Sequence, residues 1–133
     1  MSVESTRRTI ERYLKEWHGD ASLLAEDVVF TVMATGQESR GRPAVMATMH
    51  HFYHVAFAAT ANLRVALYGE NNAMLEFEFV GKHIGDFAGV PATDKQVRVP
   101  MVVVYDLVND RISRARIYFE IPALLQQLGA PGR

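Results

Sequence analysis

The start of the chain has a helical pattern of apolar positions. Ile10, Tyr13, Leu14 and Trp17 follow one another at the spacing i, i+3, i+4 and i+7, and charged residues separate them. Such a stripe lies along one side of an α-helix. We therefore predict a helix over residues 4 to 18 that packs this stripe on a core.

The following segments combine strand and helix signals. The run Val-Val-Phe-Thr-Val-Met at 28–33 is β-branched and aromatic, and it predicts a first strand. The polar residues 35–40 predict a loop. A second helix is then expected to begin at 41–43, Gly-Arg-Pro, with proline in the first turn where its missing N–H costs nothing. We expect this helix to continue to about Ala58.

The second half of the chain has the pattern of strands. β-propensity dominates from Leu63 onward, and alternating runs predict long strands over 73–83, 96–107 and 111–119. A helical turn over 122–128 closes the chain. Helices followed by an antiparallel meander predict an α+β fold with the helices on one face of the sheet.

Alternation also assigns the strand side chains to two faces, because neighbours point to opposite sides. One face is almost purely apolar and is expected to pack under the helices; it holds Leu75, Phe77, Phe79, Val97, Val99, Met101, Val103, Tyr105, Ala115, Ile117 and Phe119. The outer face mixes charged with apolar side chains: Glu76, Glu78, Arg98, Arg114, Arg116, Val80, Pro100, Val102, Val104 and Tyr118. This is more apolar surface than a solvated face needs, so we predict a homodimer through the outer face.

The composition excludes some classes of binding partner and indicates where in the cell the protein is located. The 133 residues carry a net charge of only -1, with basic and acidic residues spread evenly, so we expect no nucleic-acid partner. No apolar run is long enough to cross a bilayer, and no signal-peptide stretch precedes the first helix, so we expect no membrane association and a cytoplasmic location. The absence of cysteine excludes disulfides and thiol chemistry. We expect one domain over residues 1–133.

Two interpretations of Glu76 and Glu78 remain open. They lie two apart on one strand face, about 7 Å from each other. If they are buried beside apolar residues, one of them, Glu78 in particular, is a candidate general base. If they are exposed, they pair with arginines across the sheet.

The predicted second helix carries three histidines. His50 and His54 share one face at i and i+4, but neither an HExxH motif nor a third ligand follows, so we expect no metal site. This helix must cover the open side of the sheet. We therefore interpret His54 and Tyr53 as polar groups of a pocket, with His54 as a proton carrier near neutral pH. The alternative is an exposed structural histidine.

Two segments resemble a known family. They are residues 81–93, Gly-Lys-His-Ile-Gly-Asp-Phe-Ala-Gly-Val-Pro-Ala-Thr, and the ending Leu-Leu-Gln-Gln-Leu-Gly at 124–129. Both resemble the SnoaL-like polyketide (ester) cyclases, members of the nuclear transport factor 2-like superfamily with the ketosteroid isomerases and limonene epoxide hydrolases. The resemblance extends over nearly the whole chain. It implies a cone-shaped, highly curved antiparallel sheet wrapped around the N-terminal helices, with an internal apolar pocket.

The resemblance also implies roles for individual residues. Cyclases of this family use an aspartate on the last strand as general acid/base, and counting back from the shared ending places Ile117 at that position. Tyr13 resembles an oxyanion-hole donor of the isomerases, and Glu120 lies near the family's second acidic position. With the usual acid replaced, His54, Glu78 and Glu120 are the candidates for acid/base work.

A hydrophobic carbonyl compound is the expected ligand, and we expect it to be cyclised, isomerised or hydrolysed by acid/base chemistry without a cofactor. The expected lining of the pocket is Trp17, Phe30, Val32, Tyr53, Phe57, Phe77, Met101, Ile117 and Phe119. Two alternatives remain. A binding protein that holds an apolar metabolite unchanged would explain the missing acid, and a dimeric scaffold or accessory subunit would explain the outer face.

Overall fold

A computed structural model describes residues 2–16 and 20–129. The helical elements are α1 (Val3–Lys15), the 3-10 helix η1 (Ala21–Leu23), α2 (Arg42–His50), the π-helix η2 (His51–Ala56) and α3 (Ile121–Gln127). The strands are β1 (Leu24–Val32), β2 (Gln37–Arg40), β3 (Phe57–Gly69), β4 (Asn72–His83), β5 (Gln96–Val108) and β6 (Arg111–Phe119). No helix among these residues is long and apolar enough to cross a membrane.

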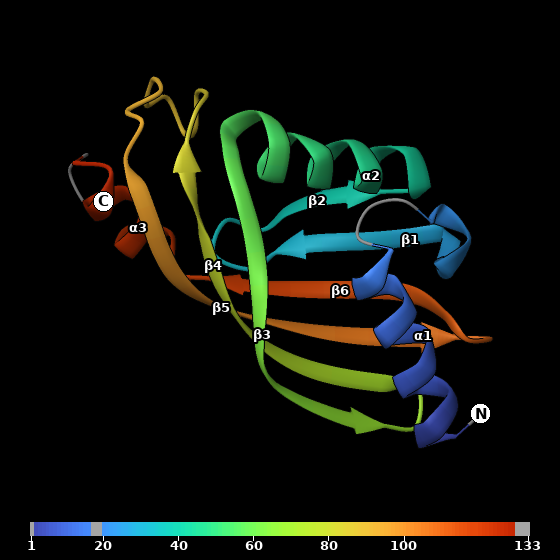
Figure 1. Cartoon of the computed structure of the whole chain (residues 1–133). Coiled ribbons are helices and arrows are strands. Elements are labelled where there is room, and N and C mark those ends of the chain that lie inside the picture. Colours follow the sequence, from blue (N-terminus) through green and yellow to red (C-terminus); the bar gives the residue numbers. More distant parts are fainter. Residues whose placement is uncertain (1, 17–19, 130–133) are drawn as a thin grey trace.

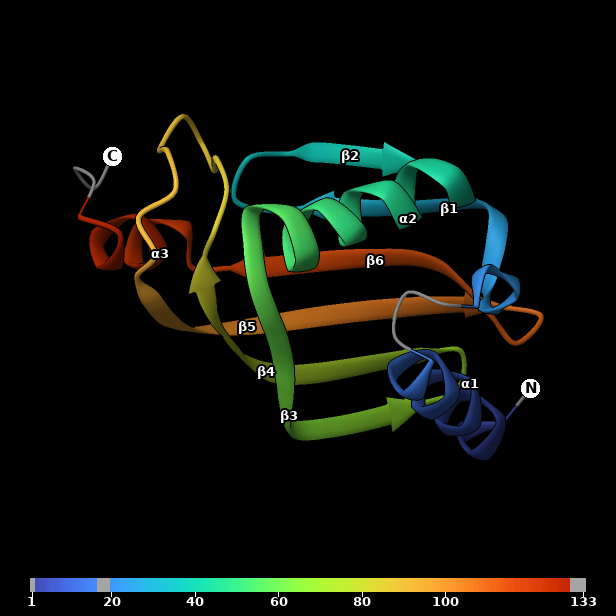
Figure 2. The same cartoon turned by 45° about the horizontal axis from the view of Figure 1, so that its top comes forward.

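The strands form one strongly curved sheet in the order β2-β1-β6-β5-β4-β3. β1 and β6 run parallel, and every other neighbouring pair is antiparallel. Figures 1 and 2 show α1 and α2 on the concave side of this sheet. α3 lies beside the end of β4 and the start of β5. The predicted α+β architecture with a curved sheet around the N-terminal helices is confirmed.

Local sequence explains how α1 begins and which side it buries. The Ser2 hydroxyl accepts a hydrogen bond from the Ser5 N–H at 3.1 Å, and the Ser5 hydroxyl accepts one from the Ser2 N–H at 3.0 Å. This reciprocal cap satisfies two backbone donors at the helix start. The predicted stripe faces the core, because Ile10 and Tyr13 are both buried.

The apolar strand face predicted from alternation is the buried one. Its centre is an aromatic cluster made of Phe52, Tyr53, Phe57, Phe79 and Phe119. Phe79 is fully buried in the middle of this cluster; its ring stacks on Phe52 with centroids 4.8 Å apart and meets Phe57 and Phe119 at 5.3 Å. Edge-to-face and stacked rings of this kind add to the stabilisation that burial alone provides.

Three sequence-based predictions about elements were wrong. Residues 37–40, predicted as a loop, form the edge strand β2, which pairs with β1 from Val29↔Arg40 to Val32↔Gln37. An edge strand needs no apolar face. Its side chains are polar, so the apolar alternation that predicts a strand is absent from this segment. β3 begins at Phe57 rather than near Leu63, and the second helix ends at Ala56, with a π-helix as its last part.

Candidate functional site

The concave face of the sheet encloses a cavity of about 580 Å³, within the range of small-molecule sites. Side chains from α1, α2, η2, the inner strands and the loop between β4 and β5 surround it. Its walls are mainly apolar and aromatic: Phe30, Val32, Met49, Phe52, Phe77, Phe87, Met101, Val103, Ile117, Phe119 and Ile121 all line it.

Three buried phenols also line the cavity and form what we call the tyrosine floor. They are Tyr13 on α1, Tyr53 on η2 and Tyr105 on β5. The rings of Tyr13 and Tyr105 meet edge to face with centroids 6.2 Å apart. Burial raises the pKa of all three phenols above the ordinary value, and neighbouring phenols add to this for Tyr53 and Tyr105. The floor therefore presents neutral O–H groups at any pH near neutrality.

The mouth of the cavity is polar. Thr35, Gln37, His51 and Asp86 line the cavity and are exposed, so they mark where it opens to solvent. Among the described residues that line the cavity, His51 and Asp86 are the titratable groups other than the phenols. None of these lining residues is a lysine or arginine. The cavity therefore combines buried neutral phenols with an exposed imidazole and an exposed carboxylate.

Two runs of side chains on the second helix reach the cavity. Ala47, Thr48 and Met49 on α2 line it, and so do His51, Phe52 and Tyr53 on η2. His51 and Phe52 follow Ala47 and Thr48 by one helical turn, so they lie on the same side of the helix. The last turn is a π-helix, a form that is frequent at functional sites.

A loop held by His83 supplies Asp86 and Phe87. The buried His83 ring accepts a hydrogen bond at Nδ1 from the Thr93 backbone N–H at 3.2 Å, and its backbone N–H donates to the Lys95 carbonyl at 2.9 Å. Near the start of the loop, the Gly85 N–H donates to the Ala56 carbonyl at 3.0 Å. The loop is thereby fixed against the end of η2, next to the mouth.

Most of the ligand contacts expected from the sequence lie around this cavity. Those that line it are Phe30, Val32, Tyr53, Phe77, Met101, Ile117 and Phe119, together with Tyr13. Phe57 is fully buried behind the lining, where its ring meets Phe52 at 5.6 Å. Trp17 lies outside the described residues.

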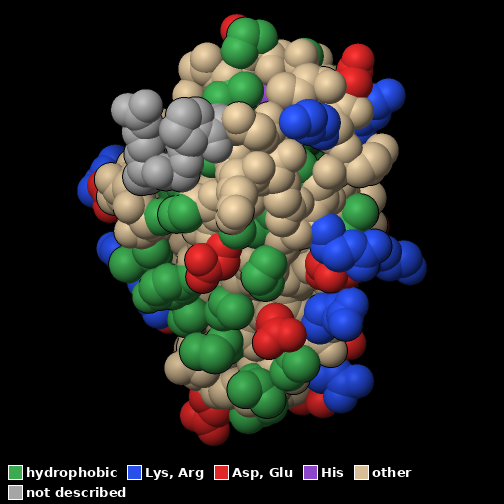
Figure 3. Space-filling view, turned by 90° about the vertical axis from the view of Figure 1, so that its left-hand side faces the viewer, with side chains coloured by type: hydrophobic (Ala, Val, Ile, Leu, Met, Phe, Trp, Pro, Cys, Tyr) green, Lys and Arg blue, Asp and Glu red, His purple; other side chains and the backbone are tan. Residues whose placement is uncertain are grey.

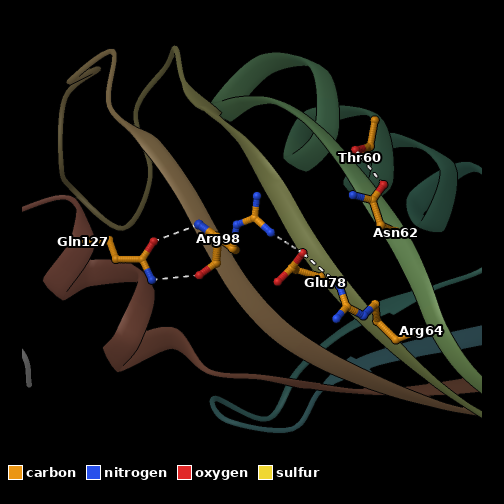
Figure 4. A network of polar contacts seen from close by, with 6 residues as sticks. All are labelled: Thr60, Asn62, Arg64, Glu78, Arg98 and Gln127. Atoms are coloured by element: carbon orange, nitrogen blue, oxygen red, sulfur yellow. Dashed lines mark hydrogen bonds and ion pairs between the residues drawn. The ribbon is translucent and has the colours of Figure 1, made fainter.

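The structure does not bring the expected acid/base residues to the cavity. His54 is exposed, with its ring 5.2 Å from that of His50, and Glu120 is exposed immediately before α3. The alternation of β4 directs Glu78 to the outer face. There its carboxylate accepts hydrogen bonds from Arg98 at 2.7 Å and Arg64 at 3.4 Å (Figure 4). Of the two interpretations of Glu78, cross-strand pairing is the one observed.

A second contact in Figure 4 holds α3 in place. The Gln127 side chain accepts from the Arg98 N–H at 2.8 Å and donates to the Arg98 carbonyl at 2.9 Å. The amide thus completes the hydrogen bonding of β5 where β6 does not pair with it, since that pairing begins at Met101↔Phe119. This anchorage keeps α3 at the edge of the cavity, where Ile121 lines it.

Sequence reasoning missed several residues of the site. His51 was given no role because the i and i+4 spacing paired its neighbours His50 and His54. Asp86 and Phe87 lie inside the glycine-containing segment 81–93, whose resemblance marked it without assigning them a role. Tyr105 was assigned to the correct face but only as core.

Comparisons with known proteins agree with this geometry. The family model of the SnoaL-like polyketide cyclases matches residues 6–128. No curated protein matches the chain by sequence. A protein from Jannaschia sp. CCS1, solved as a candidate SnoaL-like polyketide cyclase, has 18% identity and a TM-score of 0.86, over 96% of this chain and 94% of that one.

Two other solved structures have the same fold. TsrD from Streptomyces laurentii has 18% identity and a TM-score of 0.79, with 96% of each chain covered. A protein with a ketosteroid isomerase-like fold from Catenulispora acidiphila DSM 44928, solved with trimethylamine, has 17% identity and a TM-score of 0.75 over 93% of this chain and 94% of that one. At these identities the likeness shows the fold alone.

Proposed function

Because the chain belongs to the SnoaL-like polyketide cyclase family, we propose that its cavity binds a hydrophobic carbonyl compound and catalyses a cofactor-free proton transfer on it, within an isomerisation or cyclisation. The family and the fold support a small-molecule enzyme of the cyclase or isomerase type. The single observation that carries the finer proposal is the tyrosine floor inside an otherwise apolar cavity.

The tyrosine floor suits a carbonyl oxygen that becomes negatively charged. Removing a proton next to a carbonyl produces an enolate, and donors that already point at its oxygen stabilise this charge. Such donors are worth more in a dry, apolar site than in water. Tyr13, Tyr53 and Tyr105 are buried, neutral and line the cavity, so we assign this donor role to them.

The charge of the lining restricts the ligand. An anionic ligand would lose its hydration in this cavity without a lysine or arginine to pair with, which costs several kcal/mol. Asp86 at the mouth would oppose it further. We therefore propose an uncharged ring compound, with its carbonyl at the tyrosine floor and its polar substituents at the mouth.

Exchange of the α-hydrogens of 2-tetralone in D₂O tests this function directly. This bicyclic ketone is apolar, and deuterium incorporation at the carbon beside its carbonyl can be followed by proton NMR. We expect the wild-type protein to accelerate exchange. Tyr105→Phe should slow it about 10- to 100-fold, since a hydrogen bond to a charged group is worth about 1.5–3 kcal/mol.

Tyr68→Phe is the matched control, because this tyrosine on β3 lies outside the cavity lining. It should exchange the probe at the wild-type rate. If the wild-type protein binds 2-tetralone but leaves exchange at the buffer rate, the non-catalytic binding protein becomes the correct description. Equal rates for Tyr105→Phe and wild type would remove the role of this phenol.

We also propose that the outer face binds a second copy of the chain. Val65, Leu67, Met74 and Tyr118 are between 46% and 61% exposed on it. Figure 3 shows part of this face, with hydrophobic side chains gathered around acidic ones and basic groups along one side. A twofold axis brings a patch against itself, so a patch with both signs of charge can complement its own copy.

Light scattering at micromolar concentration tests this dimer. We expect a mass of twice 14.9 kDa for the wild type and a mass of one chain for Met74→Asp, because the variant places an unpaired charge in the middle of the interface. Ala44→Asp, an exposed change on α2, is the control and should leave the dimer intact. A wild-type mass of 14.9 kDa would disprove the dimer.

A further inference from the structure

We propose that His51 is the general base of this site and takes over the proton transfer that the family's aspartate would perform at Ile117. The proposal rests on the proposed function and deepens it by assigning the reacting side chain. Its starting point is the cavity lining, in which His51 and Asp86 are the described titratable groups besides the phenols.

The chemistry of the two groups favours the imidazole. A general base works best when its pKa lies close to the operating pH. Among side chains, an imidazole is the group suited to both taking up and returning a proton near neutral pH. The family's acid cannot compete, because the side chain at its position is the hydrocarbon of Ile117, which is buried in the cavity wall.

The fold gives His51 a position that the sequence alone does not suggest. It is the first residue of η2, and its backbone N–H bonds to the carbonyls of Ala47 and Thr48, so it lies one helical turn after these two residues. All three line the cavity, together with Phe52 and Tyr53. The neighbouring His50 and His54, at regular helical spacing, are exposed and outside that lining.

His51 is exposed at the mouth of the cavity, whereas the phenols of the tyrosine floor are buried. A ketone with its oxygen at the floor therefore directs carbon atoms toward the mouth. The unprotonated imidazole nitrogen removes the α-proton, and the C–H electron pair becomes the double bond of an enolate. The enolate oxygen accepts hydrogen bonds from the phenols, and the imidazolium returns a proton to carbon. Exposure to solvent lets His51 exchange this proton with water between the two steps, so deuterium from D₂O enters the product.

The test compares His51→Gln with His50→Gln in the 2-tetralone exchange assay. Both side chains are exposed, so both variants should fold like the wild type. We expect His51→Gln to slow exchange at least about 100-fold, the lower end of general-base contributions, while 2-tetralone still binds. His50→Gln should retain the wild-type rate. In histidine NMR spectra, 2-tetralone should shift the His51 ring signals and leave those of His50 in place.

The outcomes separate this proposal from the proposed function. Wild-type exchange that persists in His51→Gln would overturn the role of His51 and leave the function standing. Loss of exchange in Asp86→Asn with retention in His51→Gln would identify the carboxylate as the base and also overturn it. A wild-type protein that binds 2-tetralone without exchanging it would overturn the function and the role of His51 together.

Discussion

Replacing Phe79 with alanine will lower the free energy of unfolding by about 3–5 kcal/mol, the range for truncating a buried aromatic side chain. Phe79 is fully buried at the centre of the aromatic cluster, where its ring meets Phe52, Tyr53, Phe57 and Phe119 with centroids between 4.8 and 5.5 Å away. Truncation removes these contacts and leaves a void beside the cavity.

Chemical denaturation monitored by circular dichroism measures this effect. Phe79→Leu should lose less than Phe79→Ala, because the leucine refills part of the void. Val108→Ala is the control, since this side chain is 56% exposed, and it should change stability by no more than about 0.5 kcal/mol. A Phe79→Ala variant as stable as the Val108→Ala control would mean that the cluster is not the centre of the core.

Replacing Gly85 with alanine will destabilise the protein by about 2–3 kcal/mol and weaken binding of 2-tetralone. A Cβ at this position would clash with the carbonyl oxygen of Val55, a backbone atom that cannot move by itself. Overpacking of this kind costs about 1–3 kcal/mol. It would also push the loop that carries Asp86 and Phe87 away from η2, and the cavity mouth would change shape.

Gly89→Asn provides the comparison within the same loop. A Cβ at Gly89 meets nothing within 4 Å, and asparagine tolerates the left-handed backbone, with φ at +81°, that this position requires. We expect Gly89→Asn to unfold and bind close to the wild-type values, as measured by thermal denaturation and by titration with 2-tetralone. Wild-type behaviour of Gly85→Ala in both measurements would show that the loop is not pressed against η2.

The sequence was sufficient for the elements whose stability comes from one apolar face. The stripe at Ile10 and Tyr13 located α1, and alternation located β4, β5 and β6 to within one residue at each end. These predictions succeeded because burial of one face dictates the period of the apolar positions. β2 was missed for the same reason, since an exposed edge strand has no buried face to impose a pattern.

The sequence predicted the apolar residues of the cavity wall but not the titratable residue that we propose as the base. Wall residues such as Phe77, Met101 and Phe119 share the period of the inner sheet face, so strand alternation was enough. His51 is an exposed side chain on the second helix, and it reaches the cavity because that helix lies over the sheet, where the Gly85 N–H bonds to the Ala56 carbonyl. No local pattern in the second helix encodes a contact with a loop that is about 30 residues away.

The parallel pairing of β1 with β6 sets the order in which the protein can be completed during synthesis. β1 is made early but gains its central partner only when residues 111–119 have left the ribosome, and the Thr9 hydroxyl of α1 donates to the Asp110 carbonyl 101 positions later. Such distant contacts slow folding, because the long intervening chain must lose conformational entropy before the contact can form. Until then, Val28 and Phe30, both buried in the finished fold, have no sheet to cover them. The nascent N-terminal third is therefore where a chaperone would have most to protect.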